Sequence, residues 1–374
     1  MLLKGNRMSL RKSNFELCRI ICMLLIIMHH AVLHGGILGF QNCAMQTNIN
    51  ANKYIGLMFF PGGKICFDAF IVLSVWFLIN QSFKIEHFFR TWILTLFYSI
   101  TFAVVAFELG GSSIHMGHKD WFSVFFPMAG NSHGFAAAYL GFYLLTPFLS
   151  IIRDHISRNL LQILIGILFY FQVVSRIISG ITDYAPPILS NEVTLFVFFY
   201  FMILYYKKYC ASTVGVKLKN SFLICMLIGI WIYSYCTYFI GFINPSGKTY
   251  KYMVLFVKDE SSLFYIIGGM VLFLLFNNMK VFYNNKINYI AKSMFGILLY
   301  HDHNFFRPVL WHQVLKAQLF YDSPLFLAWL FGVTILIFTF GVIFDTIPRK
   351  LTGYLLRTKP FLNLSRKFSA YISA

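Results

Sequence analysis

The sequence has few charged residues, and acidic residues are especially scarce. Only 12% of its 374 residues are Asp, Glu, Lys or Arg, and Asp and Glu together number 13. A soluble globular domain usually carries about a quarter charged residues. With a mean hydropathy of +0.68, the chain cannot build an ordinary water-exposed surface, which excludes a soluble domain.

A cysteine framework, a zinc-type spacing, an internal repeat and a low-complexity segment are also missing. The first apolar run ends in His29-His30 rather than in a small-residue cleavage site, so we expect a mature span instead of a signal peptide. These absences predict a single membrane domain over residues 1–374, with short basic tails at about 1–14 and 348–374.

Long hydrophobic runs are what the sequence does have. Hydrophobic residues make up 58% of the chain, in runs that can cross a hydrocarbon core about 30 Å thick. We predict an all-α polytopic integral membrane protein with about ten transmembrane helices. Their approximate residue ranges are 16–34, 65–82, 88–110, 134–152, 159–178, 191–206, 220–243, 261–279, 289–303 and 324–347.

The distribution of the net charge of +18 indicates membrane topology rather than nucleic-acid binding. Twenty Lys and Arg fall in the two tails and the loops on their side, whereas nine fall in the opposite loops. Lys and Arg accumulate on the cytoplasmic side of membrane proteins. We therefore predict that both termini are cytoplasmic, that the longer loops 35–64, 111–133 and 304–323 face outside, and that nucleic acid is not a partner.

The first predicted span carries an ionisable stripe. His30 follows Arg19 by 11 residues, about three helical turns plus roughly 20°, so both share one face about 16 Å apart. Glu16 precedes Arg19 by one turn and can pair with it, His34 falls near the same stripe, and His29 points about 80° away. Geometry alone equally allows the histidines to bond neighbouring helices and Arg19 to reach the inner headgroups.

Four blocks of the chain resemble the membrane acyltransferase-3 family, which includes bacterial polysaccharide O-acetyltransferases. Residues 11–36 resemble the family's opening, where an arginine, ten residues and a histidine are matched by Arg19 and His30. Residues 66–74 resemble its second span, although Val75 replaces the glycine usual there.

The two other blocks lie later in the chain. Residues 139–148 resemble the fourth span of the family. Residues 296–302, followed by Arg307 and Trp311, resemble the late segment of its glycan-modifying branch, with Leu299-Tyr300-His301 as a slight departure.

This resemblance implies a multi-pass O-acyltransferase of the bacterial cytoplasmic (inner) membrane. It would move an acyl group, expected to be acetyl, from cytoplasmic acyl-CoA to a hydroxyl of a cell-surface polysaccharide or its lipid-linked precursor. Acetyl-CoA would be a donor substrate, and we expect no permanently bound cofactor and no metal. The acyl group, the sugar, the hydroxyl position and the oligomeric state are left open.

The chemistry of acyl transfer assigns roles to these residues. An attacking hydroxyl must lose its proton, for which a histidine is suited, so we predict His30 as general base and Arg19 as an electrostatic contact to CoA. An acyl-His30 intermediate is the alternative. We predict that His301 and Asp302 complete the catalytic site, although they could simply cap a helix end. The predicted substrate contacts are Asp68, Arg307 and Trp311. Arg307 and Trp311 are four residues apart and could form a sugar-stacking and phosphate-contacting pair or an interfacial anchor. Asp68 is favoured as an intramembrane hydrogen-bond partner over a residue that lines the acyl channel.

Two competing interpretations are open at this stage. One is a metal site that combines His30, His301, Asp302 and His303. The other is a transporter, a flippase or a polymerase-like protein for lipid-linked glycans, which would also have many spans and basic inner loops. A transporter gives no reason for a base and a cation on one stripe, and it would more often show internal repeats.

The charge bias generates a prediction about topology. Reporter fusions after residue 215 and at the C-terminus should both report cytoplasm, and fusions near residue 120 should report the outside. An outward C-terminus would contradict the even number of crossings.

Overall fold

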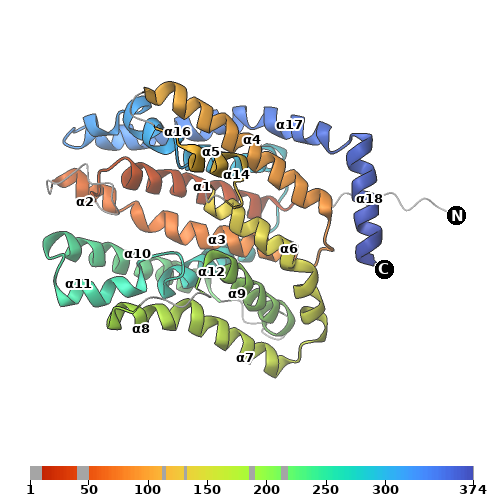
Figure 1. Ribbon diagram of the computed structural model, residues 1–374. Coiled ribbons are helices and arrows are strands. Elements are labelled where there is room, and N and C mark those ends of the chain that lie inside the picture. The colour runs from red at the N-terminus through yellow and green to blue at the C-terminus, as the bar shows by residue number, and fades with distance from the viewer. Residues whose placement is uncertain are drawn as a thin grey trace.

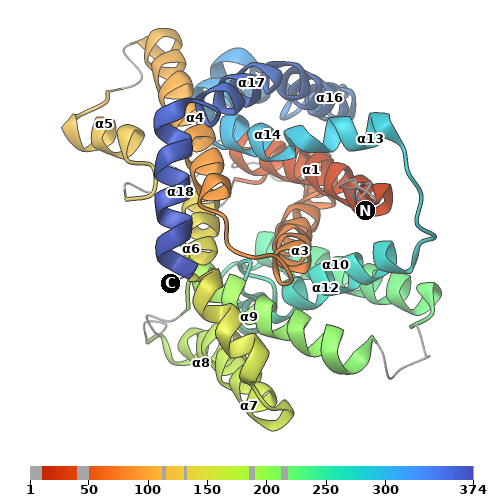
Figure 2. The same cartoon turned by 90° about the vertical axis from the view of Figure 1, so that its right-hand side faces the viewer.

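The computed structural model describes residues 11–39, 50–111, 115–129, 133–184, 190–211 and 218–373, and all regular elements in these ranges are helices. Most run side by side in one bundle, and α18 lies across the end of the bundle at which α1 begins (Figures 1 and 2).

The α-helices are α1 Ser13–His34, α2 Ala51–Leu57, α3 Phe60–Leu78, α4 Ile85–Gly110, α5 His118–Phe125, α6 Gly134–His155, α7 Arg158–Phe169, α8 Ser175–Thr182, α9 Glu192–Tyr205, α10 Asn220–Ile243, α11 Lys248–Met253, α12 Leu263–Asn278, α13 Asn285–Ile290, α14 Met294–His301, α15 Phe306–Pro308, α16 Phe326–Phe344, α17 Thr346–Leu355 and α18 Lys359–Ser373. Short π or 3-10 segments join some of them: Tyr170–Val174, Tyr206–Cys210, Val254–Phe256, Ala291–Ser293, Val309–Val314 and Ala317–Phe320.

The prediction of an all-α polytopic membrane protein is confirmed. Within the described ranges, eight helical segments are long and apolar enough to cross a membrane. Two of the ten predicted spans differ from these eight. The span predicted at 261–279 is α12, which has only 16 residues, and the span predicted at 289–303 is broken into α13, a 3-10 turn and α14.

The segment before the second span is also more helical than predicted. We expected an outer loop over residues 35–64, but α2 begins at Ala51 and α3 at Phe60. Pro61 occupies the first turn of α3, where its missing N–H costs nothing. Lys64 therefore lies on a helix of the bundle and not in a loop.

Small residues let the central helices approach closely. α1 and α3 lie side by side in the middle of the bundle (Figure 1), and a Cβ added at Gly63 of α3 would collide with the ring of His29 on α1. On the other side of α3, a Cβ at Gly269 of α12 would lie 2.5 Å from Cβ of Asp68. Such contacts are how helices pack in a membrane, where lipid is as apolar as the helix surface.

A buried polar network holds the broken helix in place. The carboxylate of Asp345, at the end of α16, accepts a hydrogen bond of 2.9 Å from the hydroxyl of Tyr98 on α4 and pairs with Nε of Arg349 at 2.7 Å. Gly296 of α14 packs directly on this carboxylate, which leaves no room for a side chain there. The network thus fixes the short helix that ends at His301.

The packing of α3 on α12 generates a prediction about stability. Gly269→Ala should lower the thermal unfolding midpoint in detergent by several degrees, because overpacking costs about 1–3 kcal/mol. Gly229→Ala on α10 is the matched control: no atom lies within 4 Å of its added Cβ, and alanine favours a helix over glycine by about 1 kcal/mol. Equal effects at the two positions would contradict this close approach.

Candidate active site

The histidine predicted as general base, His30, contacts a second histidine from a distant part of the chain. Nδ1 of His30 lies 3.0 Å from Nε2 of His301, and Nδ1 of His301 lies 2.5 Å from the carbonyl oxygen of Ile297. A carbonyl oxygen can only accept, so neutral His301 carries its proton on Nδ1 and accepts through Nε2. His30 therefore donates from Nδ1, and its basic nitrogen is Nε2.

Asp302 lies beside this pair and connects it to further polar side chains. Its Oδ1 lies 3.0 Å from Nη1 of Arg307, 3.7 Å from Nε2 of His34 and 3.9 Å from Nδ1 of His30. Sequence reasoning expected Arg307 to act with Trp311; the structure pairs it with Asp302 instead. Of the predicted site residues, His30, His301, Asp302 and Arg307 are thus brought together.

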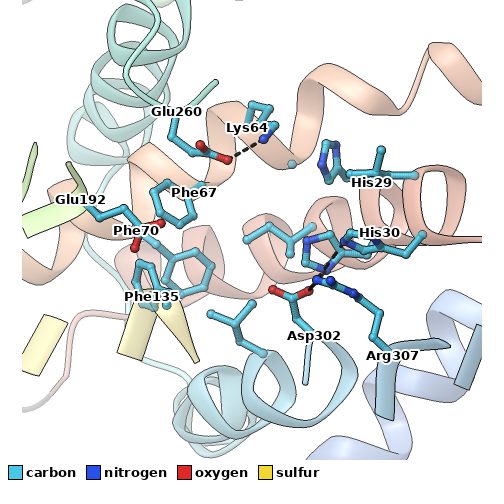
Figure 3. Close-up of a pocket in the computed structure, with 16 residues that line it drawn as sticks. His29, His30, Lys64, Phe67, Phe70, Phe135, Glu192, Glu260, Asp302 and Arg307 are labelled. Atoms are coloured by element: carbon cyan, nitrogen blue, oxygen red, sulfur yellow. Dashed lines mark hydrogen bonds and ion pairs between the residues drawn. The ribbon is translucent and has the colours of Figure 1, made fainter. Parts of the chain in front are cut away.

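His30, His34, Asp302 and Arg307 line a cavity of about 240 Å³, which we call the histidine cavity (Figure 3), whereas His301 is fully buried and does not line it. Phe67, Phe70 and Phe135 form an apolar wall, and Glu192 and Glu260 lie on the side away from His30 (Figure 3). The lining residues are Ile26, His29, His30, Leu33, His34, Gly63, Lys64, Phe67, Phe70, Gly134, Phe135, Glu192, Glu260, Leu298, Asp302 and Arg307.

An ion pair in this cavity was not anticipated from the sequence. Nζ of Lys64 on α3 lies 2.5 Å from Oε1 of Glu260, in the segment before α12 (Figure 3). Burial alone would raise the pKa of the Glu260 carboxyl, but the Lys64 ammonium outweighs it and lowers that pKa below its ordinary value. No local pattern could reveal this pair, because 196 residues separate its members.

A second, larger cavity of about 500 Å³ lies along the N-terminal half of α1, and we call it the basic cavity. Its described lining includes no Asp or Glu but holds five Arg or Lys and one histidine, His87. The lining residues are Arg11, Arg19, Met23, Phe70, Ser74, His87, Arg90, Thr91, Leu94, Phe135, Tyr139, Ala291, Lys292, Met294, Phe295, Leu298, Arg349, Thr352 and Gly353. Arg19 and Lys292, which lie within the spans predicted at 16–34 and 289–303, both line it.

Arg19 is held by its own helix. Its Nη1 donates to both carboxylate oxygens of Glu16 at 3.0 Å, so the predicted pairing of these residues is confirmed. Its guanidinium also lies 5.1 Å from the ring centroid of Phe77. The cations Arg90 and Lys292 make no ion pair with any described residue, so the basic cavity keeps an excess of positive charge.

The two cavities adjoin along three apolar side chains. Phe70, Phe135 and Leu298 line both. α1 consequently places Arg19 in the basic cavity and His30 in the histidine cavity, as expected for two residues on one helical face.

Two other predicted contacts lie away from both cavities. Asp68 is fully buried between α3 and α12, and neither carboxylate oxygen has a hydrogen-bond partner among the described residues. Trp311 is also fully buried, in the π segment after α15. Neither residue lines the basic or the histidine cavity, so neither of these predicted substrate contacts is made in these two cavities.

His29 occupies a different position from its neighbour His30. Its Nδ1 lies 2.6 Å from the carbonyl oxygen of Phe60, and its ring packs on Gly63. It is 3% exposed and touches the edge of the histidine cavity. Its hydrogen bond and packing tie α1 to α3.

The metal site considered from the sequence would need a different set of ligands. The ring nitrogens of His301 and His303 are already engaged in hydrogen bonds with neighbouring groups. The described residues whose ligand atoms all lie within 4.8 Å of one another are instead His30, His34 and Asp302. A divalent cation there would compete with the guanidinium that pairs with Asp302, and the expectation of no metal stays a prediction.

Comparison with known proteins gives one family. A family model described as an acyltransferase domain matches residues 12–346, nearly the whole chain. No curated protein and no solved structure matches the chain.

Proposed function

Since the chain belongs to the acyltransferase-3 family and is a membrane acyltransferase, we propose that it transfers acetyl from acetyl-CoA to a hydroxyl of a cell-surface polysaccharide or its lipid-linked precursor. On this proposal the protein lies in the bacterial cytoplasmic membrane, with the basic cavity open to the cytoplasm. The observation that carries the proposal is that one helix, α1, places Arg19 in a basic cavity and His30 in an adjoining one.

The basic cavity suits the donor. CoA carries a diphosphate and a 3′-phosphate, and guanidinium groups bind phosphate through paired, charge-assisted hydrogen bonds. Arg90 and Lys292 are not neutralised by a described carboxylate, so phosphates could pair with them without breaking an existing contact. The volume of about 500 Å³ lies within the usual range of small-molecule sites.

The histidine cavity suits the reaction. The acceptor oxygen attacks the thioester carbonyl carbon while Nε2 of His30 takes the hydroxyl proton. As the C–S bond breaks, the acyl group remains on the acceptor oxygen and the sulfur leaves as thiolate, which the protonated His30 can neutralise. His301 accepts from Nδ1 of His30 throughout, so it stabilises the imidazolium and orients the ring as a positioning residue.

The apolar boundary between the cavities suits the thioester. Phe70, Phe135 and Leu298 would surround the acyl group at the junction and keep water from hydrolysing it. An acyl-His30 intermediate needs the same arrangement, because Nε2 would then attack the thioester before the acceptor does.

Glycan mass analysis of cells with and without the protein tests this function, and the paired histidines sharpen the test. Wild-type protein should add an acyl mass to the glycan, His30→Ala should abolish that addition, and His29→Ala at matched protein levels should leave much of it. The reason is that His30 alone bonds His301, whereas His29 bonds a backbone carbonyl. Loss of glycan export without any change in acyl mass would favour a transporter, and the reverse order of the two variants would refute the assignment of His30.

Arg19 provides a test of the donor site. Arg19→Lys in purified protein should raise the KM for acetyl-CoA roughly tenfold, because lysine cannot reproduce a bidentate phosphate contact. The KM for the glycan should change little. Arg357→Lys, outside both cavities, is the matched control.

The competing role of Arg19 is only to reach the inner headgroups, or only to neutralise Glu16. In that case lysine would substitute well, and Glu16→Gln would be as harmful as any change at Arg19. An unchanged KM for acetyl-CoA in Arg19→Lys would contradict the placement of the donor site at this end of α1.

A further inference from the structure

The histidine cavity contains five charged side chains, and four of them neutralise one another. Lys64 pairs with Glu260 at 2.5 Å, and Arg307 pairs with Asp302 at 3.0 Å. The fifth is Glu192, which makes no hydrogen bond and no ion pair through its carboxylate with any residue in the described ranges. The cavity thus holds one carboxylate whose hydrogen-bonding capacity is unused.

Its position is set by α9. Glu192 is in the first turn of this helix, directly after the capping residue Asn191, where the helix dipole stabilises a negative charge. Figure 3 shows Glu192 near Phe70 and Phe135, with the His30 and Asp302 side chains across the cavity. A molecule that reaches both His30 and Glu192 must therefore pass along aromatic rings.

We propose that Glu192 binds the acceptor, by accepting hydrogen bonds from hydroxyl groups of an uncharged sugar ring. A carboxylate can only accept, and sugar hydroxyls can donate. The phenyl rings beside it offer a surface for the apolar C–H face of the same ring. This inference rests on the proposed function and adds the subsite that holds the sugar while one of its hydroxyls meets His30.

The charge balance also sets a specificity. Because two ion pairs leave Glu192 as the uncompensated charge, a sugar carboxylate placed beside it would be repelled in a site of low dielectric constant. The subsite therefore favours a neutral hexose over the corresponding uronic acid.

The location of Glu192 separates its effect from that of the donor residues. It lines the histidine cavity and not the basic cavity. Removing its charge should weaken acceptor binding and leave acetyl-CoA binding unchanged, which is the opposite of the result expected for Arg19.

The experiment uses the purified full-length protein, acetyl-CoA and glycan prepared from cells that lack the protein. Glu192→Gln keeps the size of the side chain and should raise the KM for the glycan about tenfold, as a charge-assisted hydrogen bond becomes a neutral one, with the KM for acetyl-CoA unchanged. Glu108→Gln, an exposed carboxylate near the end of α4, is the control and should change neither constant.

A second measurement tests the specificity with small competitors. Methyl glucoside should inhibit the wild-type reaction more strongly than methyl glucuronide, and Glu192→Gln should reduce that difference. An unchanged glycan KM in Glu192→Gln, or an equal rise in both KM values, would overturn the role of Glu192 while leaving the acyltransferase function intact. Absence of any transfer by the wild-type protein would instead overturn the proposed function, and the inference with it.

Discussion

The hydrogen bond between His30 and His301 is the contact on which the rest of the site depends. It joins the first helix to a short helix some 270 positions later, and it determines which nitrogen of His30 is free. In hydrocarbon there is no water to replace a lost partner, so leaving either imidazole N–H unpaired would be costly. The carbonyl of Ile297 is the last acceptor in this series of hydrogen bonds, and it fixes the proton of His301 on Nδ1. The position of α14 therefore decides the chemical state of a residue on α1.

The position of α14 depends in turn on polar groups near the opposite end of that helix. Asp345 connects Tyr98 on α4 with Arg349 on α17, and Gly296 lets α14 lie directly on the carboxylate. A continuous helix over this stretch would keep its backbone self-satisfied but would carry His301 elsewhere. Irregular backbone at membrane depth is tolerated where protein or a cavity surrounds it, and here α14 contributes Leu298 to both cavities.

The sequence predicted those features that depend on local spacing. The all-α fold and most spans follow from apolar runs, and the pairing of Arg19 with Glu16 follows from one helical turn. The sequence did not predict contacts between distant segments. The predicted loop over residues 35–64 includes Lys64, whereas in the bundle Gly62 and Gly63 permit close packing of α3 and Lys64 pairs with Glu260. Trp311 resembled an interfacial anchor, and only the packing of the bundle shows that it is buried.

The two adjacent histidines on α1 have different roles: His29 packs against α3, and His30 belongs to the candidate active site. Successive residues on a helix point about 100° apart, so His29 and His30 cannot face the same neighbour. His29 faces α3, where Gly63 leaves room for its ring and the Phe60 carbonyl accepts a hydrogen bond from its Nδ1. His30 faces α14 and the histidine cavity, where it donates a hydrogen bond from Nδ1 to His301 and has Nε2 without a proton. The rigidity that His29 provides between α1 and α3 also limits the movement of His30, because both residues share one backbone. A residue that serves packing on one face of α1 therefore helps to define the geometry of the site on the other face.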